Sequence, residues 1–141
     1  MTWLTYARLT LATLALSLNV GCAQRSETSV SGKVTYQGRP VQQGEITFFK
    51  PATGEVAQGA LGDGGAYSLA TADKELSPGE YHVVIAPIRI YEKVTGPQGM
   101  EYEMVEKGGE SIPVSYRDRV SSPLKATVAP GANTVDFELV E

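Results

Sequence analysis

Short stretches of alternating apolar and polar residues, separated by turn residues about every ten positions, run from Val30 to the C-terminus. In the first stretch Val30, Val34 and Tyr36 share one face, because successive side chains of a strand point to opposite faces. No window of 11 residues after Cys22 shows the apolar stripe of an amphipathic helix. The pattern therefore predicts an all-β chain.

Turns that contain Gly or Pro divide this chain into about seven short strands. Glycine permits positive φ, whereas proline fixes φ and cannot donate to a sheet. The predicted strands lie at 30–36, 45–50, 56–61, 67–69, 81–86, 124–128 and 135–139. Strands of this number and spacing favour a single antiparallel β-sandwich of the Ig-like type, and 141 residues are the length of one domain.

The stretch 88–112 differs from the rest, because it contains two glycine-bounded turns and many acidic residues. Four of its glutamates gather in the second half, at Glu101, Glu103, Glu106 and Glu110. We expect a long, mobile excursion from the sandwich, with one irregular hairpin or a helical turn. Loops of this length in compact domains are often functional or disordered, and the sequence leaves both alternatives open.

The N-terminal segment has the features of an export signal. Residues 9–18 are uncharged and follow Arg8, and a run of ten is too short to span a bilayer as a helix. The run ends at Gly21 and Cys22, the only cysteine of the chain. This junction resembles the lipobox of bacterial lipoproteins, which implies cleavage after Gly21 and a diacylglycerol on Cys22. The alternative is an ordinary signal peptide with an incidental cysteine.

These features predict a signal peptide at 1–21, a lipidated Cys22 with a flexible tether at 22–29, and a folded domain at 30–141. The acyl chains would anchor the protein, since each buried methylene contributes about 0.8 kcal/mol. We expect an exported protein attached to the cell membrane or outer membrane and facing the periplasm or cell exterior.

The folded part resembles the carboxypeptidase regulatory-like domain, a transthyretin-like (prealbumin-type) β-sandwich. The pieces that carry the resemblance are ordered along the chain at 30–36, 38–41, 44–48, 63–69 and 77–84. The segments 112–116, 122–124 and 131–137 are similar to small lipoproteins of planctomycete-type bacteria built on this domain. The resemblance implies a fold, an exported location and an accessory role, and it carries no catalytic residues and no cofactor.

Composition excludes several classes of function. Arg8 is the only charged residue before Cys22, so the remaining chain has 11 basic and 16 acidic residues and a net charge of −5. A negative surface repels a phosphate backbone, which argues against nucleic-acid binding. One cysteine excludes an internal disulfide, and one histidine excludes a His-rich metal site.

The candidate catalytic and metal-binding residues all have simpler explanations. His82 could join Ser68 or Ser77 in a triad, yet the alternation places it on the outward face of a strand and no nucleophile-elbow motif accompanies it. Asp63 lies in a tight turn with glycines and supplies only one of the oxygens that calcium needs. The glutamates of 101–110 could gather a cation, but a solvated face explains them better. We expect no catalytic residue, metal or cofactor.

Three tyrosines in or beside the excursion form the candidate interaction surface: Tyr91, Tyr102 and Tyr116. Exposed tyrosines are favoured at protein interfaces, and their rings can stack on sugars. The alternative is that they pack beneath the loop. We expect a non-enzymatic, membrane-anchored module that contacts another envelope protein; the alternatives are a carbohydrate- or peptidoglycan-binding module and, less favoured, a small hydrolase.

The anchor yields a direct prediction. Substitution Cys22→Ser removes the thiol that would carry the lipid, so we expect the protein to leave the membrane fraction. Fractionation of cells followed by immunoblotting measures this. A variant that stays with the membranes as fully as the parent chain would contradict the lipid anchor.

Overall fold

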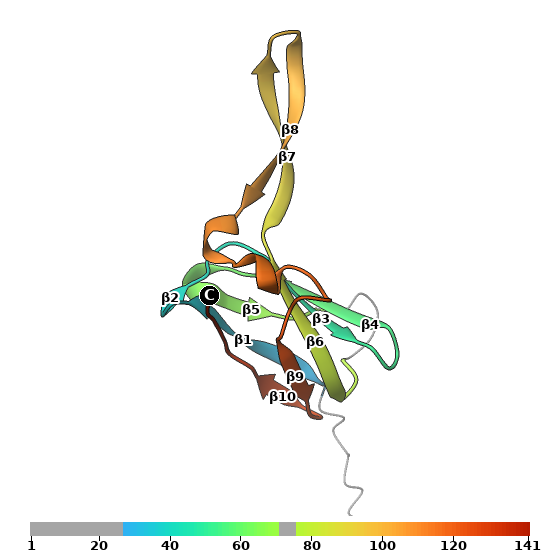
Figure 1. The fold of residues 1–141 in the computed structure, drawn as a ribbon. Helices are drawn as coiled ribbons and strands as arrows, with labels where there is room; N and C mark the ends of the chain where they lie inside the picture. The colour runs from blue at the N-terminus through green and yellow to red at the C-terminus, as the bar shows by residue number, and fades with distance from the viewer. Residues whose placement is uncertain (1–26, 71–75) are drawn as a thin grey trace, which may run out of the picture.

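The computed structural model describes residues 27–70 and 76–141, and these residues form strands and short 3-10 turns without any α-helix (Figure 1). The all-β prediction is therefore confirmed. The strands are β1 (Ser29–Tyr36), β2 (Arg39–Pro40), β3 (Glu45–Lys50), β4 (Glu55–Ala60), β5 (Ala66–Ser68), β6 (Gly79–Ala86), β7 (Ile88–Gly96), β8 (Gly99–Lys107), β9 (Lys125–Val128), β10 (Ala132–Thr134) and β11 (Phe137–Leu139). Within the described ranges no helix is long and apolar enough to cross a membrane.

The body of the protein contains two sheets. One has the order β4-β3-β6-β9 and is antiparallel throughout. The other is built around β1, which pairs antiparallel with β2 and β5 but parallel with β10 and β11. The antiparallel prediction therefore holds for the first sheet and is wrong for the C-terminal strands. Parallel pairing needs a long crossover, and residues 37–131 lie between β1 and β10.

One hydrophobic core lies between the two sheets. Phe48 of β3 is fully buried, and its ring centroid lies 6.3 Å from that of Tyr67, 6.0 Å from that of Tyr81 and 6.1 Å from that of Phe137. Tyr67 and Phe137 belong to the β1 sheet, whereas Phe48 and Tyr81 belong to the other. The inward residues of both sheets thus form a single sandwich-like core.

The predicted strand 135–139 is shorter in the structure, where only residues 137–139 (β11) are strand and β10 lies before the predicted range; Gly32 of β1 explains the interruption between β10 and β11. Residues 135 and 136 separate β10 from β11, and the Val135 carbonyl passes so close to Gly32 that a Cβ there would lie 1.8 Å from its oxygen. Tyr67 donates a hydrogen bond to the same carbonyl (2.6 Å), and the backbone N–H of Lys33 donates to Asp136 Oδ1 (2.8 Å). Backbone pairing continues to the Val135 N–H, which donates to the Ser31 carbonyl (2.8 Å), and beyond it the side chains of Tyr67 and Asp136 supply the hydrogen bonds.

The predicted excursion is a regular hairpin that projects from the body (Figure 1). Strands β7 and β8 pair over nine positions, from Ile88 opposite Lys107 to Gly96 opposite Gly99. β-Branched and aromatic residues favour the strands, namely Ile88, Ile90, Tyr91, Val94 and Thr95 in β7 and Tyr102 and Val105 in β8, and a two-residue turn joins them. A 3-10 turn at Gly109–Ser111 then leads back to the body. The hairpin prediction is correct, but the irregularity expected in it is not observed.

Gly32 provides a test of the junction between β1 and the C-terminal segment. Substitution Gly32→Ala should lower the free energy of unfolding by about 1–3 kcal/mol or more, because the methyl group meets backbone that cannot rotate away. Urea unfolding measures the loss. Gly62→Ala is the matched control, since the nearest atom to its added Cβ is 3.9 Å away, and equal losses in both variants would contradict the explanation.

Candidate functional site

The two faces of the β7–β8 hairpin differ in chemistry, and the register assigns each side chain to one of them. The tyrosine face consists of four cross-strand pairs: Arg89 with Glu106, Tyr91 with Met104, Lys93 with Tyr102, and Thr95 with Met100. The glutamate face consists of four others: Ile88 with Lys107, Ile90 with Val105, Glu92 with Glu103, and Val94 with Glu101. The hairpin thus presents two different surfaces to its surroundings.

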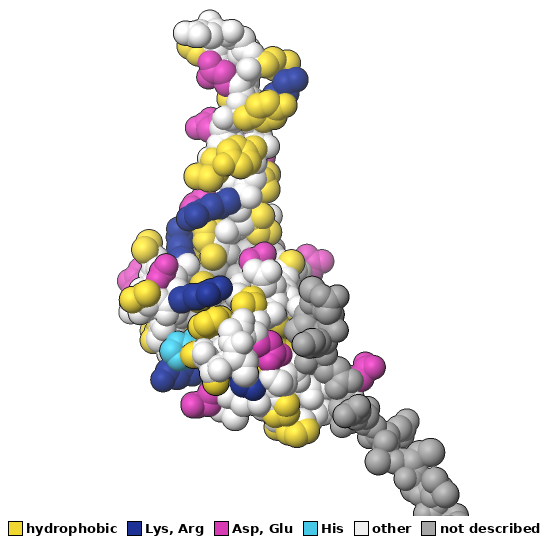
Figure 2. Space-filling model, turned by 90° about the vertical axis from the view of Figure 1, so that its right-hand side faces the viewer, with side chains coloured by type: hydrophobic (Ala, Val, Ile, Leu, Met, Phe, Trp, Pro, Cys, Tyr) yellow, Lys and Arg dark blue, Asp and Glu magenta, His cyan; other side chains and the backbone are white. Residues whose placement is uncertain are grey.

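Large apolar side chains on the tyrosine face are open to solvent. Tyr91 is 73% exposed, Tyr102 72%, Met100 66% and Met104 53%. Figure 2 shows hydrophobic side chains along the projecting hairpin, with basic side chains near its base and towards its tip. Contiguous exposed apolar residues on a protein surface mark an interaction site. The tyrosine face is therefore the candidate functional site.

The glutamate face is acidic and its apolar residues are more covered. Ile90, Val94 and Val105 are half-buried, so this face already packs part of its apolar surface. Glu92 lies opposite Glu103, and like charges in that position destabilise a strand pair. Lys107 offsets part of this repulsion through an ion pair with Glu92 (2.8 Å).

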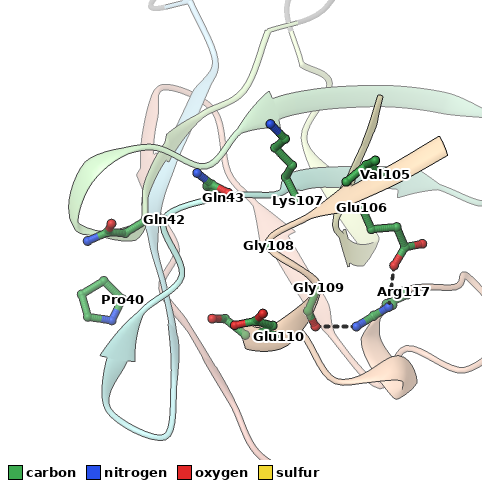
Figure 3. Close-up of a pocket in the computed structure, with 11 residues that line it drawn as sticks. Pro40, Gln42, Gln43, Val105, Glu106, Lys107, Gly108, Gly109, Glu110 and Arg117 are labelled. Carbon is green, nitrogen blue, oxygen red and sulfur yellow. Dashed lines mark hydrogen bonds and ion pairs between the residues drawn. The ribbon is translucent and has the colours of Figure 1, made fainter. Parts of the chain in front are cut away.

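Arg117 connects the base of the hairpin to the body. It lies just after the 3-10 turn Val114–Tyr116, and its guanidinium donates to the carbonyl of Gly109 (2.6 Å) and twice to that of Ile112 (2.9 and 2.6 Å). It also pairs with Glu106 Oε2 (3.3 Å) (Figure 3). Arg89 pairs with Oε1 of the same carboxylate (3.0 Å). Glu106 is therefore held by two arginines, which fixes the start of the hairpin.

An open cavity of about 810 Å³ lies beside this connection (Figure 3). Its lining is largely polar and includes Gln42, Gln43, Lys107, Glu110 and Arg117. Gly108 forms part of its wall with φ +84°, and a Cβ there would lie 2.0 Å from the Gln43 carbonyl oxygen. Only glycine permits this approach between the end of β8 and the segment that follows β2.

The structure separates the three predicted tyrosines. Tyr91 and Tyr102 lie on the hairpin and are exposed, as an interaction surface requires. Tyr116 is only 5% exposed, and its hydroxyl donates to the Val140 carbonyl and accepts from the Val140 N–H, both at 3.1 Å. Assigning Tyr116 to the surface was therefore wrong: the turn after Pro113 directs its ring into the core, and the packing alternative applies to it.

His82 lies on the outward face of β6, as predicted, but it is half-buried rather than fully open to solvent. It lines a shallow hollow of about 310 Å³ together with Lys50, Glu80 and Lys125. Ser77 is not its partner: the Ser77 hydroxyl and N–H both donate to Glu55, the N–H at 2.9 Å, and Lys50 Nζ donates to the hydroxyl at 2.8 Å. The structure gives no triad centred on His82 among the residues it describes.

The cluster around Ser77 fixes the turn that leads into β6. Lys50 Nζ also donates to the Pro78 carbonyl (2.7 Å), and the Tyr81 hydroxyl donates to the Ser77 carbonyl (2.7 Å). Burial alone raises the pKa of Glu55, but hydrogen bonds from Ser77 and the charge of Lys50 outweigh it, so that pKa lies below its usual value. Glu55 is therefore an ionised acceptor in a structural network.

No group of three potential metal ligands of the types His, Cys, Asp and Glu occurs in residues 27–70 and 76–141. Asp63 is exposed in the 3-10 turn Asp63–Gly65. The loop glutamates do not converge: Glu101 and Glu103 lie on the glutamate face, Glu106 on the tyrosine face and Glu110 in the turn beyond β8. Cys22 and Gly21, the predicted lipidation and cleavage residues, lie outside the described residues.

Sequence reasoning missed two parts of the site, the four-pair tyrosine face and the Arg117 connection. The first had a signal, since Tyr102 and the methionines at 100 and 104 recur with period two. The second had none, because Arg117 acts on carbonyl groups and on a carboxylate that only the folded turn brings within reach.

Comparison with known proteins finds no family model and no curated protein that matches this chain. Among solved structures, the chain is similar to the crystal structure of a 9R-lipoxygenase from Cyanothece PCC8801, with a TM-score of 0.36 and 9% sequence identity. The similarity covers 82% of this chain and 16% of the lipoxygenase. A likeness this weak carries no argument about fold or activity.

The Arg117 connection makes a testable prediction. Substitution Arg117→Met removes the guanidinium donor of the Ile112 carbonyl and leaves the Gly109 carbonyl with only the longer bond from the Ile112 N–H (3.4 Å), so we expect a loss of about 1–3 kcal/mol in stability and faster amide exchange in β7 and β8. Lys107→Met is the control, because it removes only an exposed ion pair, worth at most about 1 kcal/mol. Unchanged exchange in the Arg117 variant would show that the connection does not hold the hairpin.

Proposed function

We propose that this protein is an exported, lipid-anchored envelope protein without catalytic activity, and that it binds another protein through the tyrosine face of its hairpin. The observation that carries the proposal is the exposure of Tyr91, Met100, Tyr102 and Met104 on one face of a projecting element. A two-stranded hairpin is marginally stable by itself in water. A protein partner that covers this face would remove the apolar surface from water and stabilise the hairpin.

The body would be a transthyretin-like sandwich of the carboxypeptidase regulatory-like type. The order of the turn and strand motifs along the sequence supports this assignment, and so does the single core between two sheets. In this proposal the body is a rigid support, and the binding function belongs to the segment 88–107 that extends from it.

The direction of the hairpin favours a protein over the lipid surface as its binding partner. The chain enters the body at Ser29, whereas the hairpin base contacts Gln43, beyond the opposite end of β1 (Figure 1). The tether from Cys22 to Ser29 spans seven residue steps and reaches about 25 Å at full extension. An anchor at Cys22 would therefore keep the entry end near the membrane and direct the hairpin away from it.

The polar clusters of the body support a non-enzymatic role. Ser77 is the serine nearest to a catalytic arrangement, but its hydroxyl already donates to Glu55 and accepts from Lys50. Activation of a serine requires a base that can accept its proton. The hydrogen bonds and the charge of Lys50 lower the pKa of Glu55, which makes that carboxylate a weaker base, and the Lys50 ammonium group cannot accept a proton. These groups are explained by the turn that they hold in place.

A carbohydrate- or peptidoglycan-binding module is the second candidate, and the cavity at the hairpin base favours it. Gln42, Gln43 and Glu110 offer amide and carboxylate groups that can bond sugar hydroxyls. The exposed ring of Tyr91 or Tyr102 could stack on a sugar. A glycan would then occupy the cavity and part of the hairpin together.

The experiment is cross-linking of the full-length protein in its own cells, followed by mass spectrometry of what co-purifies. We expect a cross-linked protein species that the double substitution Tyr91→Ala with Tyr102→Ala abolishes. The matched control is Val114→Ala with Val120→Ala, which removes two other exposed side chains and should preserve it. A species that survives the tyrosine substitutions would contradict the proposal, and recovery of bound glycan in its place would establish the second candidate.

A further inference from the structure

We propose that the tyrosine face binds the tyrosine face of a second copy of this chain, with the two hairpins related by a two-fold axis along their length. This inference rests on the proposed function, because lipid-anchored copies in one membrane direct their hairpins the same way. It goes beyond that function by naming the partner and the residues that meet.

The cross-strand pairs of the tyrosine face make it self-complementary. Each pair joins unlike residues, so that β7 contributes Tyr91, Lys93 and Thr95 where β8 contributes Met104, Tyr102 and Met100. A two-fold axis along the hairpin places β7 of one copy over β8 of the other. Each side chain therefore meets the residue that lies opposite it in its own hairpin.

The contacts that result are favourable and occur twice. Lys93 of each copy lies over the Tyr102 ring of the other, a cation–π arrangement that strengthens as water is excluded. Tyr91 of each copy lies over the Met104 thioether of the other, and sulfur–aromatic contacts are likewise attractive. No charged side chain among these three pairs is left facing one of the same sign.

The opposite orientation, with the hairpins antiparallel, is less favourable. A two-fold axis across the hairpin at the central pair places Lys93 over Lys93 and brings two ammonium groups together. The glutamate faces form a less favourable contact, since Glu92 of each copy would meet Glu103 of the other and bring like charges together twice. Charge therefore selects the tyrosine face and the parallel direction.

The twist of the hairpin determines how much of the face is used. Two-stranded ribbons twist strongly, so two hairpins cross at an angle instead of lying flush. Contact is then centred on the Lys93–Tyr102 pair, in the projecting part of the hairpin, and the two bodies diverge from the crossing point. The Arg89–Glu106 pair at the base lies outside this contact, and Glu106 keeps its ion pair with Arg117.

The area of this interface indicates a weak dimer that the membrane reinforces. Two tyrosines and two methionines per copy would bury about 500 Å², or about 1,000 Å² in total, which is the lower limit for a specific interface. Confinement of both copies to one membrane raises their effective concentration and favours association without any additional contact.

The test uses full-length protein, co-expressed as two differently tagged copies, one with Lys93→Cys and the other with Tyr102→Cys. A thiol-specific cross-linker about 10 Å long, the spacing of packed sheets, is then added to the membranes. This combination keeps one of the two reciprocal Lys–Tyr contacts intact. The matched control is Glu92→Cys with Glu103→Cys, an equivalent cross-strand pair on the glutamate face.

We expect at least about tenfold more mixed-tag product from the Lys93 and Tyr102 positions than from the control, a preference of about 1.4 kcal/mol. Equal yields at both faces would show random collision and overturn the inference. No mixed-tag product, with a different protein still captured through Tyr91 and Tyr102, would overturn the second copy as partner and leave the proposed function standing. No mixed-tag product and no captured protein would overturn both.

Discussion

Packing around Phe48 is the interaction on which the rest of the structure depends. Its ring contacts Tyr67 and Phe137 from one sheet and Tyr81 from its own, so it joins the two layers at their centre. Tyr67 then bonds the Val135 carbonyl, and burial, with the charge of Asp136, raises its pKa, so the hydroxyl remains a donor. The aromatic core thereby also fixes the C-terminal strands beside β1, and a body held in this way can support an element that it does not cover.

The hairpin depends on that body through a few polar groups and not through packing of its own faces. Arg117 bonds the carbonyls of Gly109 and Ile112 and pairs with Glu106, and Gly108 allows the chain to pass against Gln43. These contacts all lie at the base. Beyond the base, β7 and β8 pair only with each other. The contacts at the base therefore determine the direction of the hairpin, and its two faces are left to contact solvent or a partner.

The sequence allowed most strands of the body and the two exposed tyrosines to be predicted, because both depend on local signals, whereas the regular strands β7 and β8 were expected only as an irregular excursion. Alternation identified the strand that contains Tyr81 and placed His82 outward, and the turn residues marked most strand ends. The failures involve long-range contacts. The parallel pairing of β10 and β11 with β1 depends on Gly32 and Tyr67, which are distant from these strands in sequence. The burial of Tyr116 depends on a turn whose only local signals are Ile112 and Pro113.

The exposed tyrosine face has a physical consequence for the free protein. Each hairpin strand has a partner on one side only, so its outer edge presents unpaired backbone groups, and charged residues on such an edge discourage uncontrolled pairing. Glu92, Glu101 and Glu103 serve this purpose on one face. On the tyrosine face, the three pairs beyond Arg89–Glu106 contain one charged residue, Lys93. It lies opposite the aromatic ring of Tyr102. A surface that resists association on one face and permits it on the other is therefore directional, so the hairpin can bind one neighbour without uncontrolled aggregation.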